Sequence, residues 1–237
     1  IFFQKYSQMS RSQQGLAGAG EWETLRKLLP DFKDKRVLDL GCGYGWHCIY
    51  AMEHGASSVV GVDISHKMLE VAKEKTHFPQ VEYKCCAIED VEFPEESFDV
   101  ILSSLAFHYV ADYEILVKKI YRILKSGGKL VFTVEHPVFT AYGTQDWYYN
   151  KKGEILHFPV DNYYYEGKRT AVFLGEKVTK FHRTLTTYLN TLLSNGFIIN
   201  HIVEPQPPEY MMDIPGMQDE MRRPMMLIVS ANKKVDG

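Results

Sequence analysis

The stretch Val37-Leu38-Asp39-Leu40-Gly41-Cys42-Gly43-Tyr44-Gly45 decides the fold of this chain. Residues 36–40 form a short apolar run that predicts a buried strand, and residues 46–54 predict a helix that ends at Gly55. Three glycines at alternate positions lie between the two. Because glycine lacks a Cβ, such a turn lets the backbone pass close to a ligand. The segment therefore predicts a strand, a binding turn and a helix in direct succession.

The same alternation of strand and helix continues along the chain. Further strands are predicted at residues 58–62, 81–85, 98–102 and 129–134, and helices at 21–29, 67–75 and 113–124. A helix at 184–194 and strands at 197–203 and 225–231 close the pattern. Alternation at this pace predicts right-handed crossovers and a mainly parallel sheet with helices on both faces.

The composition is that of one globular domain, predicted to span all 237 residues, 1–237. Lysine and arginine number 27 against 30 aspartates and glutamates, a net charge of -3. A sequence-independent nucleic-acid binder carries a basic excess, so no nucleic-acid partner is expected. No apolar run of about 18 residues predicts a membrane span. Residues 1–12 are polar and lack the apolar region of a signal peptide.

The cysteines form no CxxC pair; they are Cys42, Cys48, Cys85 and Cys86. This spacing favours free thiols in a reducing compartment over disulfides or a zinc site, and it predicts a cytoplasmic protein. The histidines also fall at no spacing that converges with cysteines or acids. No metal site is predicted.

A carboxylate occupies the position where a ribose-binding residue would be expected. Asp63 closes the strand after the glycine turn, 22 residues beyond Gly41, and it can accept hydrogen bonds from ribose hydroxyls. A dinucleotide fingerprint requires a third glycine three positions after the second, and Trp46 occupies that position here. The third glycine, Gly45, comes one position too early. The spacing argues against a nicotinamide dinucleotide without excluding a nicotinamide-dependent oxidoreductase.

The D-x-G-x-G form of the turn resembles motif I of the class I S-adenosylmethionine (SAM)-dependent methyltransferases. Three later segments resemble, in order, the ubiquinone/menaquinone-type (methyltransferase type 11) group: residues 88–99 its ED-L-PF-DGSFD passage, 105–110 its LHHV stretch and 124–128 its LKPGG turn. Ser126 replaces the usual proline of that turn. The resemblance implies an α/β, Rossmann-like sheet of seven mainly parallel strands with the last antiparallel. It also implies methyl transfer from SAM to a small-molecule acceptor, releasing S-adenosylhomocysteine.

The resemblance assigns the cofactor to the ends of the first two strands. Gly41, Cys42 and Gly43 would lie under the methionyl part and the ribose of SAM. Asp63 would bind the ribose hydroxyls. Asp39 would face the amino-acid end of SAM, directly or through water.

The adenine would lie farther along the sheet, against Ile64 and Met68. The family often has an aspartate for the adenine amino group where Ala87 stands here. The backbone N–H of Ile88 is therefore the expected adenine partner.

Two further segments would approach the methionine moiety. Ser104 and Leu105, just past the fourth strand, would do so through backbone groups. Residues 1–30 would form an N-terminal lid and helix, from which Tyr6 or Arg11 reaches the SAM carboxylate, since arginine pairs well with carboxylates. The alternative is a frayed terminus whose aromatic side chain packs on the sheet.

Two histidines are candidate catalytic residues. A sulfonium already activates its methyl group, so a general base is needed only where the acceptor holds a proton. His108 lies beside the expected methyl position, and a packed histidine is the alternative reading. Glu135 and His136 end the fifth strand, face the same crevice and are better placed to meet an acceptor, although a histidine before Pro137 also suits a turn.

An aromatic-rich insertion follows the fifth strand. Residues 136–182 contain 11 aromatics in 47 residues, and no helical or strand period persists there. We expect this insertion to cap the acceptor, with a methionine-rich loop at 205–226 as another wall. A homodimer interface is the alternative, because interfaces also favour tyrosine and tryptophan. A SAM-binding regulatory protein without turnover would carry the same motifs.

Overall fold

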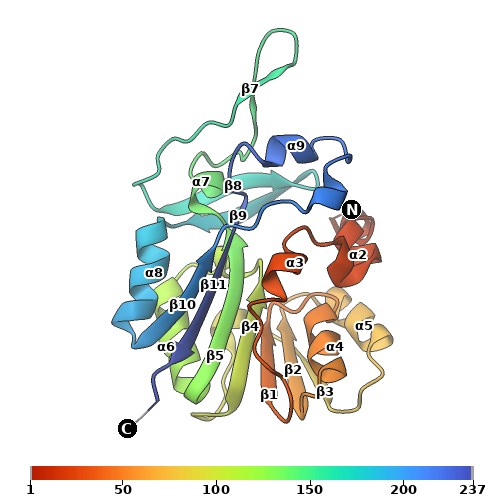
Figure 1. Cartoon of the computed structure of the whole chain (residues 1–237), viewed down its shortest axis with the longest axis vertical. Coiled ribbons are helices and arrows are strands. Elements are labelled where there is room, and N and C mark those ends of the chain that lie inside the picture. The colour runs from red at the N-terminus through yellow and green to blue at the C-terminus, as the bar shows by residue number, and fades with distance from the viewer. Residues whose placement is uncertain (1, 236–237) are drawn as a thin grey trace.

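A seven-stranded sheet forms the centre of the structure, a computed structural model that describes residues 2–235 (Figure 1). Its strands are β1 (Arg36–Leu40), β2 (Ser58–Asp63), β3 (Val81–Cys85), β4 (Phe98–Ser104), β5 (Leu124–Glu135), β10 (Phe197–Val203) and β11 (Met226–Lys233). The order across the sheet is β10-β11-β5-β4-β1-β2-β3. All pairs from β5 to β3 are parallel, and β11 is antiparallel to both of its neighbours. This confirms the predicted Rossmann-like sheet.

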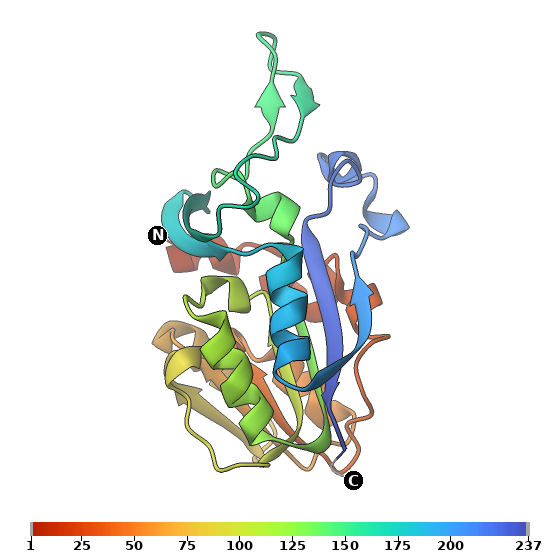
Figure 2. The same ribbon diagram turned by 90° about the vertical axis from the view of Figure 1, so that its left-hand side faces the viewer.

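Helices cover both faces of the sheet (Figures 1 and 2). The short α3 (Trp22–Leu25), α4 (Trp46–Glu53) and α5 (His66–Lys75) lie on one face, and α6 (Tyr113–Ile123) and α8 (Leu185–Ser194) lie on the other. The predicted N-cap of α5 is confirmed, because Ser65 Oγ accepts the N–H of Met68 at 3.4 Å. The helix predicted at 21–29 is wrong in length, since α3 ends at Leu25.

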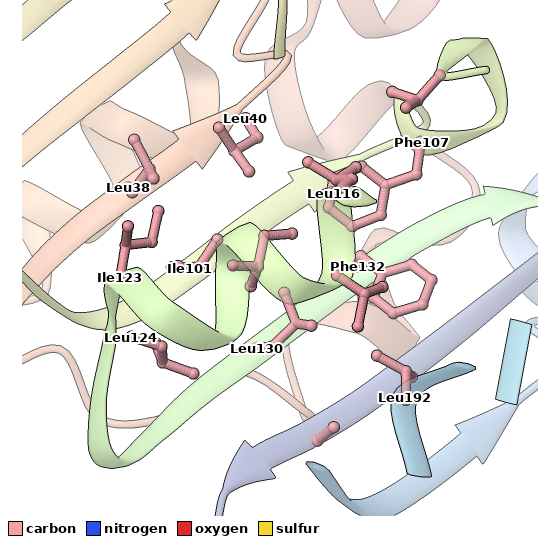
Figure 3. Close-up of a cluster of buried hydrophobic side chains, with 14 of the residues drawn as sticks. Leu38, Leu40, Ile101, Phe107, Leu116, Ile123, Leu124, Leu130, Phe132 and Leu192 are labelled. Carbon is pink, nitrogen blue, oxygen red and sulfur yellow. The ribbon is translucent and has the colours of Figure 1, made fainter. Parts of the chain in front are cut away.

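The core consists of two apolar clusters separated by the sheet. The larger lies under α6 and α8, and Figure 3 shows its centre, where Leu116 and Leu192 meet side chains of β1, β4 and β5. The smaller lies under α3, α4 and α5 and includes Cys48 and Leu69. Strands that are buried on both faces must be apolar at consecutive positions, which is why β1, β2 and β4 lack strict alternation.

The insertion after β5 is more regular than its sequence predicts. It holds α7 (Pro137–Thr140), a small hairpin of β6 (Tyr148–Tyr149) and β7 (Ile155–His157), and a longer hairpin of β8 (Gly167–Phe173) and β9 (Glu176–His182). Leu174 and Gly175 join β8 to β9 with φ values of 53° and 79°. Positive φ at both positions is the geometry of a tight two-residue hairpin turn. The prediction that no strand period persists here is wrong.

Strand β5 begins before the predicted turn. It runs from Leu124 through residues 126–128, where Gly127 has a φ of 70° and the pairing with β4 shifts register. The N-terminal segment lies over the carboxyl edge of the sheet, where it forms α1 (Phe2–Ser7), α2 (Ser10–Gln13) and a 3₁₀ turn (Gly15–Gly18). The single domain predicted over 1–237 stays a prediction, and residues 1, 236 and 237 lie outside the described part. Among residues 2–235, no helix is long and apolar enough to cross a membrane.

Adjacent leucines on α8 test the assignment of the core. Leu192 is fully buried, whereas Leu193 is 53% exposed. We expect Leu192→Ala to lower the free energy of unfolding by about 2–5 kcal/mol, because it leaves a cavity beside Phe132 and Tyr188. The matched control Leu193→Ala should change it by about 0.5 kcal/mol or less. Urea denaturation of the two variants measures both, and equal losses would contradict the assignment.

Candidate functional site

A cavity of about 760 Å³ lies outside the carboxyl ends of the parallel strands. The chain order reverses between β1 and β4, and such a switch point is where open α/β sheets bind ligands. The lining includes most of the predicted cofactor residues: Tyr6, Arg11, Gly41, Gly43, Asp63, Ile64, Met68, Ala87, Ile88, Ser104 and Leu105. Of the two predicted catalytic histidines, His108 lines the cavity and His136 does not. Asp39 and Cys42 are also absent from the lining.

The three glycines of the first turn have different structural roles. A Cβ on Gly41 would lie 2.4 Å from the Cβ of Ala106, and one on Gly45 would lie 2.1 Å from Tyr83 Oη. Both positions are therefore required by packing within the protein. A Cβ on Gly43 would meet nothing nearer than Tyr6 Oη at 3.9 Å. Gly43 thus presents open backbone to the cavity, which suits the close approach of a ligand.

The carboxylate of Asp63 is fixed by two backbone donors. Gly43 N–H donates to Oδ2 at 2.9 Å, and Ser65 N–H donates to Oδ1 at 2.8 Å. Burial raises the pKa of Asp63, and these two hydrogen bonds oppose that effect. Because a carboxylate oxygen has two lone pairs, each oxygen keeps one for a further donor. The geometry fits a pair of neighbouring hydroxyls.

An apolar surface lies next to this carboxylate. Ile64 lines the cavity although its side chain is 74% exposed, and Met68 lies beneath it on α5. Ala87 and Ile88 complete this part of the wall. A large exposed aliphatic side chain at a cavity rim is typical of a ligand-covered surface.

The end of β4 carries a strained backbone. Leu105 has a φ of 53°, a left-handed conformation that is uncommon for a residue with a side chain. Its N–H is shared between Thr133 O at 2.9 Å and Thr133 Oγ1 at 3.0 Å. Ser104 Oγ also contacts Thr133 Oγ1 at 3.3 Å. Thr133 of β5 thereby holds the 104–105 backbone against the cavity.

Asp39 and Cys42 lie beneath the glycine turn. The Asp39 side chain is buried, its Oδ2 accepts from Cys48 Sγ at 3.5 Å, and Oδ1 has no partner among the described residues. Burial raises the pKa of Asp39 to about 7. The side chain of Cys42 is also buried. A direct side-chain contact of either residue with a ligand in the cavity is not supported by this placement.

The N-terminal helices line one side of the cavity, and their role as a lid stays a prediction. The Tyr6 ring packs edge-on against Tyr44 at 5.6 Å between centroids, and burial raises the pKa of Tyr6. Arg11 forms an ion pair with the buried Glu21 at the cavity wall. A Cβ on Gly175 would lie 2.6 Å from Lys5 Nζ, so α1 reaches the tip of the β8–β9 hairpin. Figure 1 shows the N-terminal helices beside that hairpin.

The two predicted catalytic histidines have different environments. His136 Nδ1 caps α7 by accepting Val138 N–H at 3.1 Å, and Nε2 lies 2.9 Å from Glu204 Oε1. His136 therefore occupies the turn that its place before Pro137 also predicted. His108 lines the cavity, and its Nδ1 accepts the N–H of Glu135 at 3.3 Å. Burial lowers the pKa of His108 to about 4, so its imidazole is neutral near pH 7.

The sequence placed Glu135 at the crevice but did not reveal the polar network that it forms beside His108. Lys180 Nζ donates to Glu135 Oε1 at 2.5 Å and to Gln145 Oε1 at 2.8 Å, and Gln145 Nε2 donates to Glu135 Oε2 at 2.6 Å. Lys180 is 2% exposed, and Gln145 has a left-handed φ of 61°. The buried Lys180 lies within β9, a strand that the sequence analysis did not predict. Finding its partners required the register of a hairpin that the sequence did not predict.

The aromatic insertion contributes less to the cavity than predicted. Of its described aromatic residues, Phe173 lines the cavity. Trp147 packs against Phe158 at 5.3 Å and against the guanidinium of Arg223 at 5.0 Å. The β6–β7 hairpin points away from the sheet (Figure 2). Tyr164 is 87% exposed, so an interface role for these tyrosines stays a prediction. No cluster of histidine, cysteine and acidic side chains in the described chain is arranged to hold a metal ion.

The buried Asp39 predicts an unusual pH dependence of stability. Its pKa is about 7 in the folded chain against 3.8 for an unperturbed aspartate, so the folded state keeps a proton that the unfolded state has lost. Stability should fall as the pH rises from about 4 to about 7, by up to about 1.4 kcal/mol per pH unit. Asp39→Asn should remove this slope. Urea denaturation of the unmodified chain and of Asp39→Asn at pH 5 and pH 8 tests this prediction. An equal change in the free energy of unfolding with pH in the two proteins would refute it.

Comparisons with known proteins identify the family. A family model described as a methyltransferase domain matches residues 38–132. A solved structure from Listeria monocytogenes, described as an S-adenosylmethionine-dependent methyltransferase, is 57% identical with a TM-score of 0.89, over 93% of this chain and 99% of that one. One from Mesorhizobium loti is 40% identical with a TM-score of 0.85, over 92% of this chain and 100% of that one.

A curated relative agrees over part of its length. The ubiquinone biosynthesis O-methyltransferase of Coxiella burnetii is 36% identical over 112 residues, which is 46% of this chain and 47% of the relative. The Listeria and Mesorhizobium structures extend the match over nearly the whole chain. Together with the sheet order and the cavity at its switch point, they show that this chain belongs to the S-adenosylmethionine-dependent methyltransferases.

Proposed function

We propose that the cavity holds SAM against the glycine turn and that a small-molecule acceptor enters beside His108 and Phe173. The observation that carries this proposal is the pair Asp63 and Gly43. The carboxylate keeps one free lone pair on each oxygen, and the neighbouring backbone is open to the cavity. These two features suit a ribose that lies on the turn.

The remaining residues of the wall fit the other parts of SAM. Ile64 and Met68 offer an apolar surface for the adenine, and the backbone at Leu105 faces the cavity at the end of β4. Arg11 is the cation of the lid that would approach the carboxylate of SAM. Its pairing with Glu21 holds the guanidinium in place.

The chain has to position the reactants and exclude water. When bound, SAM supplies a methyl group that is already activated by its sulfonium. Tyr6 and the N-terminal helices cover one side of the cavity, and Phe173 of the β8–β9 hairpin covers another. Exclusion of water strengthens electrostatic contacts within such a site.

The N-terminal helices and the β8–β9 hairpin, which cover the cavity, also support a small acceptor. Lys5 of the N-terminal helix and Gly175 of the hairpin lie close together, and this favours an acceptor small enough to fit within the cavity. The chain also has a net charge of -3, which does not favour a polyanionic partner. A homodimer and a cytoplasmic location stay predictions.

Titration calorimetry tests the cofactor assignment. We expect the chain to bind SAM and S-adenosylhomocysteine but not NAD, and Asp63→Ala to cost about 2–4 kcal/mol of SAM affinity, because both ribose contacts are lost. Glu74→Ala, on the exposed face of α5, is the matched control and should bind SAM as the unmodified chain does. Thermal melts verify that each variant folds. Unchanged SAM binding by folded Asp63→Ala, or binding of NAD alone, would refute the assignment.

A further inference from the structure

One wall of the cavity gathers polar and aromatic side chains that are not among the proposed SAM residues. His108, Tyr109, Glu135 and Phe173 line it, and Lys180 lies behind them. The ammonium of Lys180 is 2.5 Å from Glu135 Oε1, 5.6 Å from the centroid of the Phe173 ring and 6.0 Å from that of Tyr109. The rings of His108 and Tyr109 are 4.4 Å apart. These distances place the five residues in one compact group.

The imidazole of His108 offers a hydrogen-bond donor to this wall. Its Nδ1 accepts the backbone N–H of Glu135, so in the neutral ring the proton is on Nε2. His108 is 1% exposed but lines the cavity, and its Nε2 makes no hydrogen bond to another described residue. His108 Nε2–H is therefore available to a molecule in the cavity.

The carboxylate of Glu135 offers an acceptor beside it. Lys180 bonds one carboxylate oxygen and Gln145 bonds the other, which leaves a lone pair on each. Gln145 keeps this contact although its backbone has a left-handed φ of 61°. A strained residue that closes a buried hydrogen-bond triangle indicates that the orientation of Glu135 matters.

We propose that His108 and Glu135 together bind a hydroxyl group of the acceptor. This inference goes beyond the proposed function and rests on it. A hydroxyl both donates and accepts, so it can accept from Nε2 and donate to the carboxylate. An ammonium would be repelled by Lys180 and cannot accept, and a carboxylate would face Glu135. Tyr109, Phe173 and Met225 supply an apolar surface for the body of the molecule.

This arrangement also gives the hydroxyl proton a destination. Methylation joins the acceptor oxygen to the methyl carbon, and the electron pair of the broken carbon–sulfur bond stays on sulfur. The proton that leaves the oxygen passes to a carboxylate oxygen of Glu135. Burial raises the pKa of Glu135, and the interactions with His108, Lys180 and Gln145 lower it below its usual value, so the carboxylate is ionised at neutral pH.

Three probes that share one ring isolate the functional group. Phenol, benzylamine and benzoate are titrated into the full chain saturated with S-adenosylhomocysteine, and binding is followed by ligand-observed NMR. We expect phenol to bind at least about tenfold more tightly than the two charged probes, because it alone satisfies both partners. Equal binding of the three, no binding of phenol, or tighter binding of a charged probe would overturn the proposal.

A matched pair of variants assigns the donor. The carbonyl of His108→Asn can replace Nδ1 as acceptor of Glu135 N–H but offers no donor at the position of Nε2. The amide of His108→Gln reaches that position. We expect His108→Asn to lose about tenfold in phenol affinity and His108→Gln to lose less. A purely structural role predicts the opposite order, which would overturn the assignment.

Gln145→Gly tests the same wall without a change in the cavity lining. Glycine accepts the left-handed backbone, so the variant should fold, while Glu135 loses its amide partner. We expect phenol to lose affinity and its advantage over benzylamine to shrink, with S-adenosylhomocysteine affinity unchanged. An unchanged phenol preference would count against Glu135. If the unmodified chain fails to bind S-adenosylhomocysteine, the proposed function itself fails, and this proposal fails with it.

Discussion

The hydrogen bond from Gly43 N–H to Asp63 Oδ2 joins the ends of β1 and β2 into one surface, and the rest of the site is arranged around it. A carboxylate buried this far would be costly without donors, and the backbone of two successive turns supplies them at Gly43 and Ser65. The same bonds fix the direction of the free lone pairs. Gly41 and Gly45, which have no room for a Cβ, hold the turn close enough for the contact to form.

Features that depend on residues adjacent in the sequence were predictable from the sequence. The strand at 36–40, the glycine turn, Asp63 and the Ser65 cap are local patterns, and the structure has each of them. The β8–β9 hairpin was missed because Leu174 occupies a left-handed turn position where glycine or asparagine is expected. Its absence from the prediction also hid Lys180, whose partner Glu135 lies 45 residues earlier. Contacts over such separations follow from register and not from composition.

The two histidines show how context decides the role of one residue type. Both follow sheet strands closely, and both were predicted near the acceptor. Pro137 sets the backbone that starts α7, so the preceding His136 becomes its N-cap and turns toward Glu204. His108 instead sits on a 3₁₀ turn after β4, where the backbone of β5 takes up Nδ1 and leaves Nε2 toward the cavity. The helix-start signal at Pro137 therefore distinguishes the environments of the two histidines, which their positions after neighbouring strands do not.

In the proposed arrangement, the cofactor half of the cavity comes mainly from one part of the chain and the acceptor half mainly from a later part. The matched family segment ends at residue 132, and it includes the glycine turn, Asp63 and Leu105. Glu135, Gln145, Phe173 and Lys180 all lie beyond it, on the insertion or at its start, and the lid lies before it. Resemblance in the sheet can thus identify the methyl donor without identifying the acceptor. The acceptor must be inferred from the groups that the later segment orients. In our proposal these are the carboxylate of Glu135, held by Lys180, and Nε2 of His108, whose ring is held by the sheet through Nδ1.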